Sequence, residues 1–245
     1  MKKITYDIEW NLESTHWWFS GRRRLLKFLL SYLSIQRDSP VIDVGCGVGS
    51  NLPLLKSMGF KVIGIDSESY GLSFAKNLSE VLLINGDVLN LPVKSNSIEL
   101  VIATDILEHL DDDSIGIKEI HRTLTREGKL ILTVPAFDFL WGIQDVVGMH
   151  KRRYSKNEFL KKIEREGFTV LKSSYFNFFL FFPIFLGRRL IRLFGLKIES
   201  ENKINSPLIN FFLRTLFGIE PYILKYFSFP FGVSIFCIAK KRDDE

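Results

Sequence analysis

The stretch that decides the fold is VIDVGCGVGS, residues 41–50. An apolar run containing one acid, Asp43, leads directly into Gly45, Gly47 and Gly49. Glycine adopts positive φ readily and lets a ligand approach the backbone more closely than a Cβ would permit. A helix that follows such a turn points its free N–H groups at the ligand. We therefore expect a buried strand, a tight turn and a helix that hold a nucleotide-like ligand; the alternative is an ordinary glycine-rich turn.

Outward from this stretch, short apolar runs alternate with segments of helical periodicity. Repeated strand–helix–strand order favours a parallel sheet with helices on both faces, so the predicted fold class is α/β. Strands are predicted at residues 61–65, 81–84, 98–103, 129–135, 169–175 and 232–239, and helices at residues 21–34, 52–58, 69–78, 111–127 and 155–167.

Length and composition favour a single domain, because 245 residues with 46% hydrophobic side chains suffice for one sizeable core. We divide the chain into four predicted parts. They are an N-terminal lid or helix (1–38), a cofactor-binding core (39–176), a helical apolar and basic insertion (177–228), and a last strand with a tail (229–245).

The cysteines, the N-terminus and the net charge limit which metals, compartments and partners we expect. Cys46 and Cys237 provide no disulfide framework and show no metal-ligand spacing with any histidine, so no metal is expected. The N-terminus lacks the apolar segment of a secretory signal, which favours the cytoplasm. The net charge of +5 is mild. Its basic clusters, at residues 22–24, 151–153 and 188–192, suit anionic partners or form solvated faces.

Acidic residues recur where the predicted strands end. Asp66, Asp87 and Asp105 each follow an apolar run, and ligands of open parallel sheets bind beyond these strand ends. Asp66 also lies at roughly the 20-residue offset at which an acid meets ribose hydroxyls in dinucleotide folds. Solvated loop acids have no reason to select these positions, so the pattern strengthens the interpretation of the glycine turn as a pocket.

The details of the turn distinguish between cofactors. A dinucleotide fingerprint requires a third glycine where Ser50 stands, so NAD fits poorly. An acid in the strand followed by GxGxG resembles the first motif of the class I S-adenosylmethionine-dependent methyltransferases. Asp43, Gly45, Gly47 and Gly49 match that motif, and the resemblance covers residues 41–135.

The resemblance implies a Rossmann-like, mostly parallel sheet of seven strands, with the last strand antiparallel and a helical insertion before it. It implies that the glycine turn holds the methionine portion of S-adenosylmethionine, that Asp66 binds the ribose hydroxyls, and that Asp87 and Val88 flank the adenine. Cys46, Ser67, Thr104 and Asp105 complete the expected cofactor contacts.

The segment DILEHL, residues 105–110, is similar to the corresponding segment of small-molecule methyltransferases of the ubiquinone-biosynthesis type. The Asn/Asp-Pro-Pro-aromatic signature of relatives that methylate amino groups of nucleic acids does not occur there. We therefore expect a small-molecule or lipid-linked acceptor and no nucleic-acid partner.

The candidate catalytic and lid residues are histidines and aromatics. His109 and His150 are the candidate bases, since imidazole titrates near neutral pH; a structural role is the alternative for each. His16, Trp17 and Trp18 are expected to cover the cofactor or to pack in the core. Tyr154, in the segment GMHKRRYS, completes the lid set, and His121 is expected at the surface.

Residues 175–187 and 206–227 are rich in Phe and Leu. The first run is too short to span a bilayer and is followed by Arg188, Arg189 and Arg192. Such a segment fits an interfacial surface on anionic lipid, which would place the protein peripherally on the inner face of a membrane. A helical cap over the acceptor pocket or a dimer surface is the alternative.

Together these features predict an enzyme that transfers a methyl group from S-adenosylmethionine to a small-molecule or lipid-linked acceptor, at oxygen, nitrogen or carbon. Two alternatives belong to other classes. One is a catalytically inactive, membrane-associated cofactor-binding protein, and the other is an NAD-linked oxidoreductase, which Ser50 and Asp43 argue against.

Overall fold

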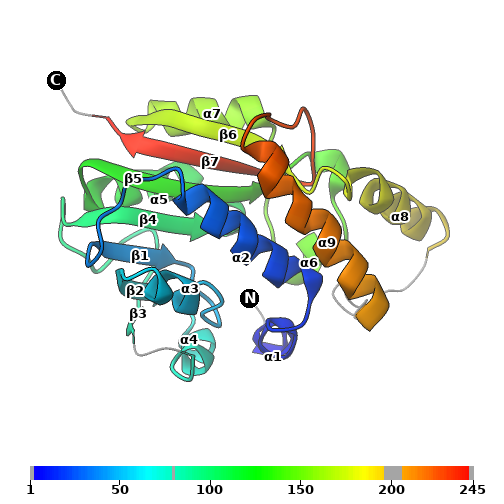
Figure 1. Cartoon of the computed structure of the whole chain (residues 1–245), viewed down its shortest axis with the longest axis horizontal. Helices are drawn as coiled ribbons and strands as arrows, with labels where there is room; N and C mark the ends of the chain where they lie inside the picture. Colours follow the sequence, from blue (N-terminus) through cyan, green and yellow to red (C-terminus); the bar gives the residue numbers. More distant parts are fainter. Residues whose placement is uncertain (1–2, 79–80, 196–205, 243–245) are drawn as a thin grey trace.

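The computed structural model of the chain describes residues 3–78, 81–195 and 206–242 (Figure 1). Within them one seven-stranded sheet has the order β3-β2-β1-β4-β5-β7-β6. Strands β1 to β5 pair in parallel, and β7 is antiparallel to both β5 and β6. The predicted fold class is therefore confirmed, including the antiparallel last strand. The strands are β1 (Pro40–Val44), β2 (Lys61–Asp66), β3 (Leu82–Asn85), β4 (Ile98–Thr104), β5 (Leu124–Pro135), β6 (Phe168–Phe176) and β7 (Ser234–Lys241).

Helices surround the sheet, and two of those described were not predicted, α1 and α6. The helix predicted at residues 21–34 begins earlier, because His16 Nδ1 accepts a hydrogen bond from Trp18 N and so caps its first turn. The helices are α1 (Lys3–Leu12), α2 (Trp17–Leu30), α3 (Leu52–Ser57), α4 (Ser69–Ala75), α5 (Asp113–Thr123), α6 (Ile143–Gly148), α7 (Lys156–Arg165), α8 (Phe181–Leu193) and α9 (Pro207–Leu224), with short 3₁₀ turns at Leu107–His109 and Asp138–Leu140.

The central strands form the core. Val41 and Ile42 on β1, Leu100 on β4 and Ile131 on β5 have no exposed surface. Strands covered by helices on both faces bury consecutive side chains, which explains why their sequences are continuous apolar runs rather than alternating ones. Because β1, β4 and β5 are parallel, their carboxyl ends lie at the same edge of the sheet.

Helices α2 and α9, from opposite ends of the chain, lie side by side in Figure 1. Gly21 of α2 allows this approach, since a Cβ there would lie 2.1 Å from Cδ1 of Phe217. Asn210 Oδ1 of α9 accepts a hydrogen bond from Trp17 N at 3.1 Å. The predicted insertion thus contains helix α9, which packs on the helix that begins with the aromatic cluster.

Glu220 fixes α9 to the end of β6. Its carboxylate has no exposed surface and accepts hydrogen bonds from Asn177 N at 2.7 Å and Phe179 N at 3.3 Å. Burial raises the pKa of Glu220 to about 7. The start of α8 is therefore held by a side chain distant in the sequence.

The expectation that His121 lies at the surface is wrong. The side chain is half-buried and meets the ring of Phe168 edge-on, with centroids 5.2 Å apart. It packs there because α5 lies against the start of β6, where Gly167 leaves room for the imidazole.

Candidate active site

The glycine turn folds over the end of β2. Gly45 N and Cys46 N both donate to Ile65 O, at 2.8 and 3.1 Å, and Gly47 N donates to Asp66 Oδ2 at 2.8 Å. Gly45, Gly47 and Gly49 all have positive φ, at 69°, 53° and 89°. The predicted strand–turn–helix is thus present, and hydrogen bonds tie it to the neighbouring strand.

The three glycines have different reasons to lack a side chain. A Cβ on Gly45 would lie 2.7 Å from Ile106 Cδ1, and one on Gly49 would lie 2.9 Å from Ala75 Cβ. A Cβ on Gly47 would meet only Tyr6, at 4.0 Å, and Gly47 lines the cavity described below. Gly45 and Gly49 therefore serve packing, whereas Gly47 leaves space on the side of the cavity.

Two buried acids support the turn. Asp43 accepts hydrogen bonds from Asn51 Nδ2 on both oxygens at 3.3 Å, and burial raises its pKa to about 7. Asp66 Oδ1 accepts from Glu68 N at 2.8 Å while Oδ2 accepts from Gly47 N. Burial raises the pKa of Asp66 against the opposing effect of these two hydrogen bonds. Each Asp66 oxygen has a further lone pair, so the carboxylate can also accept from a ligand.

A cavity of about 450 Å³ extends from this turn to the end of β4 and beneath α8. Its size lies within the usual range of small-molecule sites. The predicted site residues that line it are Gly45, Cys46, Gly47, Asp66, Thr104, Asp105, His109, His150, His16, Trp17 and Trp18.

The other predicted site residues do not line the cavity. Asp43 and Gly49 lie behind the turn, and Ser67, Asp87 and Val88 lie near the ends of β2 and β3. Tyr154 is buried, and its hydroxyl donates to Asp113 Oδ2 at 2.8 Å.

Sequence reasoning missed charged residues of the cavity. Arg22 Nη1 lies 3.0 Å from Asp105 Oδ2, and its guanidinium lies 5.8 Å from the centroid of the Trp18 ring. Glu9 of the unpredicted α1 also lines the cavity, and burial raises its pKa to about 7 although the charge of Arg22 opposes the shift. Arg22 was visible only as part of a basic cluster, and no motif indicated Glu9.

Two histidines meet at the end of β4. The rings of His109 and His150 are nearly perpendicular, with centroids 4.9 Å apart. Burial and then the neighbouring His150 lower the pKa of His109 to about 4, so it is a neutral imidazole at neutral pH. Glu108 has no exposed surface, and burial followed by the charge of Asp105 raises its pKa.

Asp145 of α6 holds His150 in place. Its Oδ1 lies 2.8 Å from His150 Nδ1, and both of its oxygens accept from Arg153, at 2.8 and 3.0 Å. Burial favours a higher pKa for Asp145, but the hydrogen bond from His150 and the charge of Arg153 outweigh it and hold the pKa at about 2. Neither Asp145 nor Arg153 was predicted as a site residue.

Helix α8 covers this end of the cavity. Pro183, Ile184, Gly187 and Ile191 line it, together with Arg188. Arg188 donates to Leu140 O and lies 3.8 Å from Asp145 Oδ2, with its side chain 11% exposed. The expectation that Arg188 faces lipid headgroups is therefore wrong, because this arginine points inward. Among the described residues, every helix is too short or too polar to cross a bilayer.

Comparisons with known proteins agree with this geometry. Residues 42–132 match the family described as a methyltransferase domain. A demethylmenaquinone methyltransferase of Staphylococcus epidermidis is 27% identical over 167 residues, which is 62% of this chain and 66% of that protein. An uncharacterised protein of Methanocaldococcus jannaschii is 30% identical over 149 residues, 61% of this chain and 63% of that protein. The chain therefore aligns with slightly under two thirds of the length of these relatives.

Solved structures show the same fold. A chain from the complex of the Haloferax volcanii Trm112 methyltransferase activator and a putative methyltransferase has a TM-score of 0.64 at 17% identity, covering 96% of this chain and 93% of that one. The S-adenosylmethionine complex of Haemonchus contortus phosphoethanolamine N-methyltransferase 2 has a TM-score of 0.60 at 18% identity, covering 89% of this chain and 52% of that one. Residues 42–132 are therefore similar to the methyltransferase domain family, and the chain shares the fold of a protein solved with S-adenosylmethionine bound.

Proposed function

We propose that the protein transfers a methyl group from S-adenosylmethionine to a small-molecule or lipid-linked acceptor, at oxygen, nitrogen or carbon. The observation that carries this proposal is the continuity of the cavity, which joins the glycine turn and Asp66 to His109 and His150. A donor bound at the turn and an acceptor bound near the histidines would share one cavity.

The cofactor end would bind S-adenosylmethionine through the turn. The space beside Gly47 suits close approach of the ligand to the backbone, and the free lone pairs of Asp66 suit a ribose diol. In this proposal, Asp87 and Val88 flank an adenine that extends past the ends of β2 and β3. Trp17 and Trp18 would cover the sulfonium, which the face of an aromatic ring attracts without neutralising its charge.

The acceptor end would align the reactants. Methyl transfer from a sulfonium is an in-line displacement, so positioning and exclusion of water supply most of what is needed. His109, with its pKa lowered to about 4, is a neutral imidazole that can accept a hydrogen bond from an acceptor, but it is a weak base at neutral pH. The apolar side chains of α8 would exclude water from this end.

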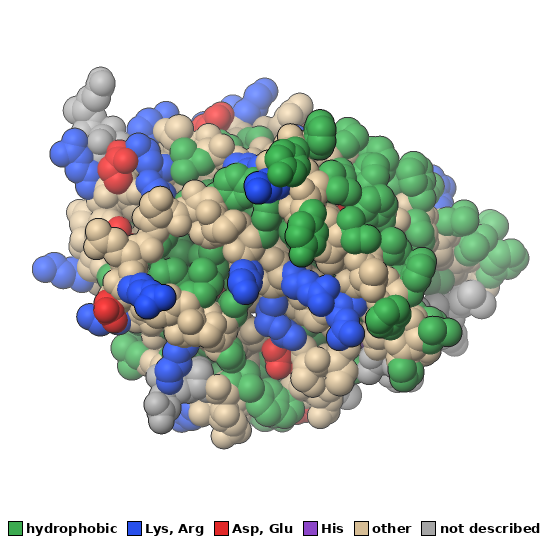
Figure 2. All heavy atoms as spheres, viewed as in Figure 1, with side chains coloured by type: hydrophobic (Ala, Val, Ile, Leu, Met, Phe, Trp, Pro, Cys, Tyr) green, Lys and Arg blue, Asp and Glu red, His purple; other side chains and the backbone are tan. Residues whose placement is uncertain are grey.

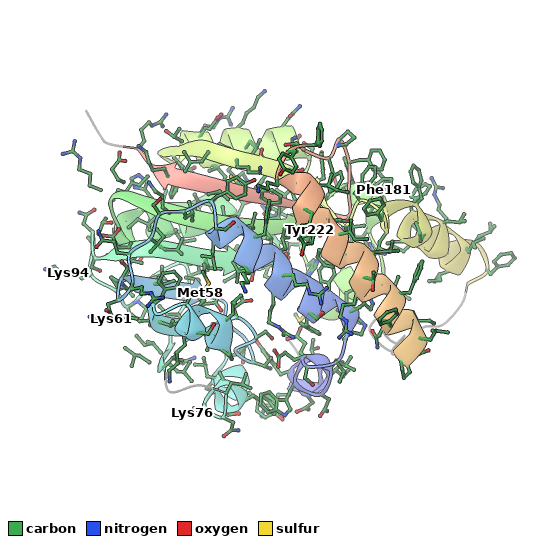
Figure 3. The ribbon with its side chains drawn as sticks, in the orientation of Figure 1. Met58, Lys61, Lys76, Lys94, Phe181 and Tyr222 are labelled. Carbon is green, nitrogen blue, oxygen red and sulfur yellow. The ribbon has the colours of Figure 1, made fainter. Side chains whose placement is uncertain are left out.

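An exposed apolar face beside the cavity supports a lipid-linked acceptor. Large apolar side chains recur at helical spacing on the outer sides of α8 and α9, and Figure 2 shows hydrophobic surface gathered over these helices. Tyr222, labelled in Figure 3, is 76% exposed. The face consists of Phe182, Leu186, Leu190, Leu193, Phe194, Leu208, Phe211, Phe212, Ile219 and Tyr222. The name of the Staphylococcus epidermidis relative indicates a quinone acceptor, and this class suits such a face.

Calorimetry with S-adenosylhomocysteine tests the cofactor assignment. Asp66→Ala should weaken binding by about 1.5–3 kcal/mol, the range for hydrogen bonds to charged groups. Asp138→Ala serves as the matched control, because Asp138 is an exposed acid outside the cavity. Binding of NAD with no response to S-adenosylhomocysteine would refute the proposal. Incubation with labelled S-adenosylmethionine and a lipid or metabolite extract would then identify the acceptor by the label it acquires.

Sedimentation with vesicles tests the membrane part. Arg189 and Arg192 are exposed at the edge of the apolar face, and each basic residue contributes about 1 kcal/mol near an anionic surface. Changing both to Gln should weaken binding to anionic vesicles by roughly 30-fold. The matched control changes Lys161 and Arg165 to Gln, which removes the same charge from α7. Absence of binding to any vesicle would leave the face as a protein-contact surface.

A further inference from the structure

Three potential metal ligands converge at the end of β4. Each of the side chains of Glu108, His109 and His150 offers one donor atom, and these three atoms lie within 4.8 Å of one another. Chain spacing does not reveal this group, because α5, β5 and α6 separate His150 from the other two residues. All three side chains line the cavity, so the group is accessible from within it.

The carboxylate of Glu108 lacks the partners that a buried acid normally has. The residue has no exposed surface, and among the described residues neither of its oxygens has a hydrogen-bond partner. Within the group, His150 Nε2 lies 4.0 Å from Glu108 Oε1, which is too long for a hydrogen bond. Buried carboxylates are nearly always paired or bound to a cation, so these two oxygens require an explanation.

His150 is oriented as a ligand would be. Its Nδ1 faces Asp145 Oδ1 at 2.8 Å, and Arg153 fixes that carboxylate from the other side. When Nδ1 donates to Asp145, the lone pair of Nε2 is left toward Glu108. A carboxylate that holds the second nitrogen of a histidine is the usual support of a metal-bound imidazole.

Space exists beside the donor atoms. Gly148 lines the cavity and has no side chain. A Cβ at this position would lie 2.9 Å from His150 Nε2, so the glycine keeps the region beside this nitrogen free. Donor atoms around an ion at about 2.0–2.2 Å lie roughly 3–3.5 Å apart, so the observed group needs only small side-chain rotations to close on one.

From this geometry we propose that Glu108, His109 and His150 bind a divalent transition-metal ion. Two imidazoles and one carboxylate suit Zn²⁺, Co²⁺ or Fe²⁺, whereas Mg²⁺ and Ca²⁺ prefer oxygen ligands alone. Three protein ligands leave positions open toward the cavity, as in catalytic metal sites. In combination with the proposed methyl transfer, on which this consequence rests, an ion with an open position would lower the pKa of a bound acceptor hydroxyl, whose proton would pass to water.

Metal titration of the chelator-treated protein tests the site. Co²⁺ followed by visible absorption, and Zn²⁺ followed by calorimetry, should each show one strong site per chain. Glu108→Gln, which keeps the shape of the side chain, should weaken binding by at least 100-fold. Asp145→Asn should weaken it by about 10–100-fold, as for other residues that orient a metal ligand. Mg²⁺ should not compete at equal concentration.

Two controls separate a lost site from a lost fold. His121→Gln removes a histidine outside the group and should leave the stoichiometry and affinity unchanged. Urea unfolding of Glu108→Gln should remain a single cooperative transition, which shows that the domain is folded and keeps this test independent of the methyltransferase assignment. Absence of a strong site in the wild type, or equal affinity in Glu108→Gln, would overturn the proposal.

Discussion

The two sides of the cavity are constructed differently. On the turn side, Gly47 and Asp66 come from two adjacent strand ends, and backbone hydrogen bonds hold them. On the covering side, α2, α8 and α9 meet through side chains such as Phe217 and Glu220. Changes on the turn side should therefore act on ligand binding, whereas changes on the covering side should act first on the free energy of unfolding.

The largest expected effect is on the turn side. Gly47→Val should abolish cofactor binding while the domain stays folded, because the side chain would enter the cavity and disfavour positive φ. The measurement is calorimetry with S-adenosylhomocysteine together with thermal unfolding. In Gly49→Ala, by contrast, the added Cβ would lie 2.9 Å from Ala75 Cβ, so the loss should appear mainly in stability. Normal binding by a folded Gly47→Val protein would end the assignment of the turn.

The next effect concerns the contact between α2 and α9. Gly21→Ala should lower the free energy of unfolding by about 3 kcal/mol, the upper part of the range for overpacking, because Phe217 is fully buried. Urea unfolding measures it. The matched control is Gly187→Ala in α8, where a Cβ meets nothing within 4 Å and helix propensity predicts a gain of up to about 1 kcal/mol. Equal stability of the two variants would show that α2 and α9 do not depend on close approach.

The smallest effect is a pH dependence at Glu220. Its pKa is raised from 4.5 to about 7, so its contribution to stability is complete below the unfolded value and is lost as the pH rises through about 7. The free energy of unfolding should fall by about 2 kcal/mol between about pH 5.5 and 7.5 on account of this residue. Glu220→Gln cannot ionise and should remove this part of the slope in urea unfolding at a series of pH values.

A residual slope is expected in Glu220→Gln, since Glu9 and Asp43 also have pKa values raised to about 7. If the variant and the wild type kept identical slopes, Glu220 would already be ionised in the folded protein. The hydrogen bonds from Asn177 and Phe179 would then compensate fully for its burial.

The sequence alone determined the parts whose causes are local. The glycine turn depends on the φ preferences of a few consecutive residues, and the parallel core depends on apolar runs that recur between helices. The antiparallel last strand came from the family resemblance rather than from periodicity. Helix α1 escaped prediction because KITYDIEWNL shows neither a cap nor a clear apolar stripe, and its place depends on packing against α4.

Only the tertiary structure decided which charged groups meet. Arg22 and Asp105 form an ion pair across the cavity, and Arg188 turns inward rather than toward solvent. Glu108 and His150 become neighbours because the chain returns through β5 and α6 to the end of β4. Burial and the distance between charges control the chemistry of such groups, and both quantities arise only when elements far apart in the sequence pack together.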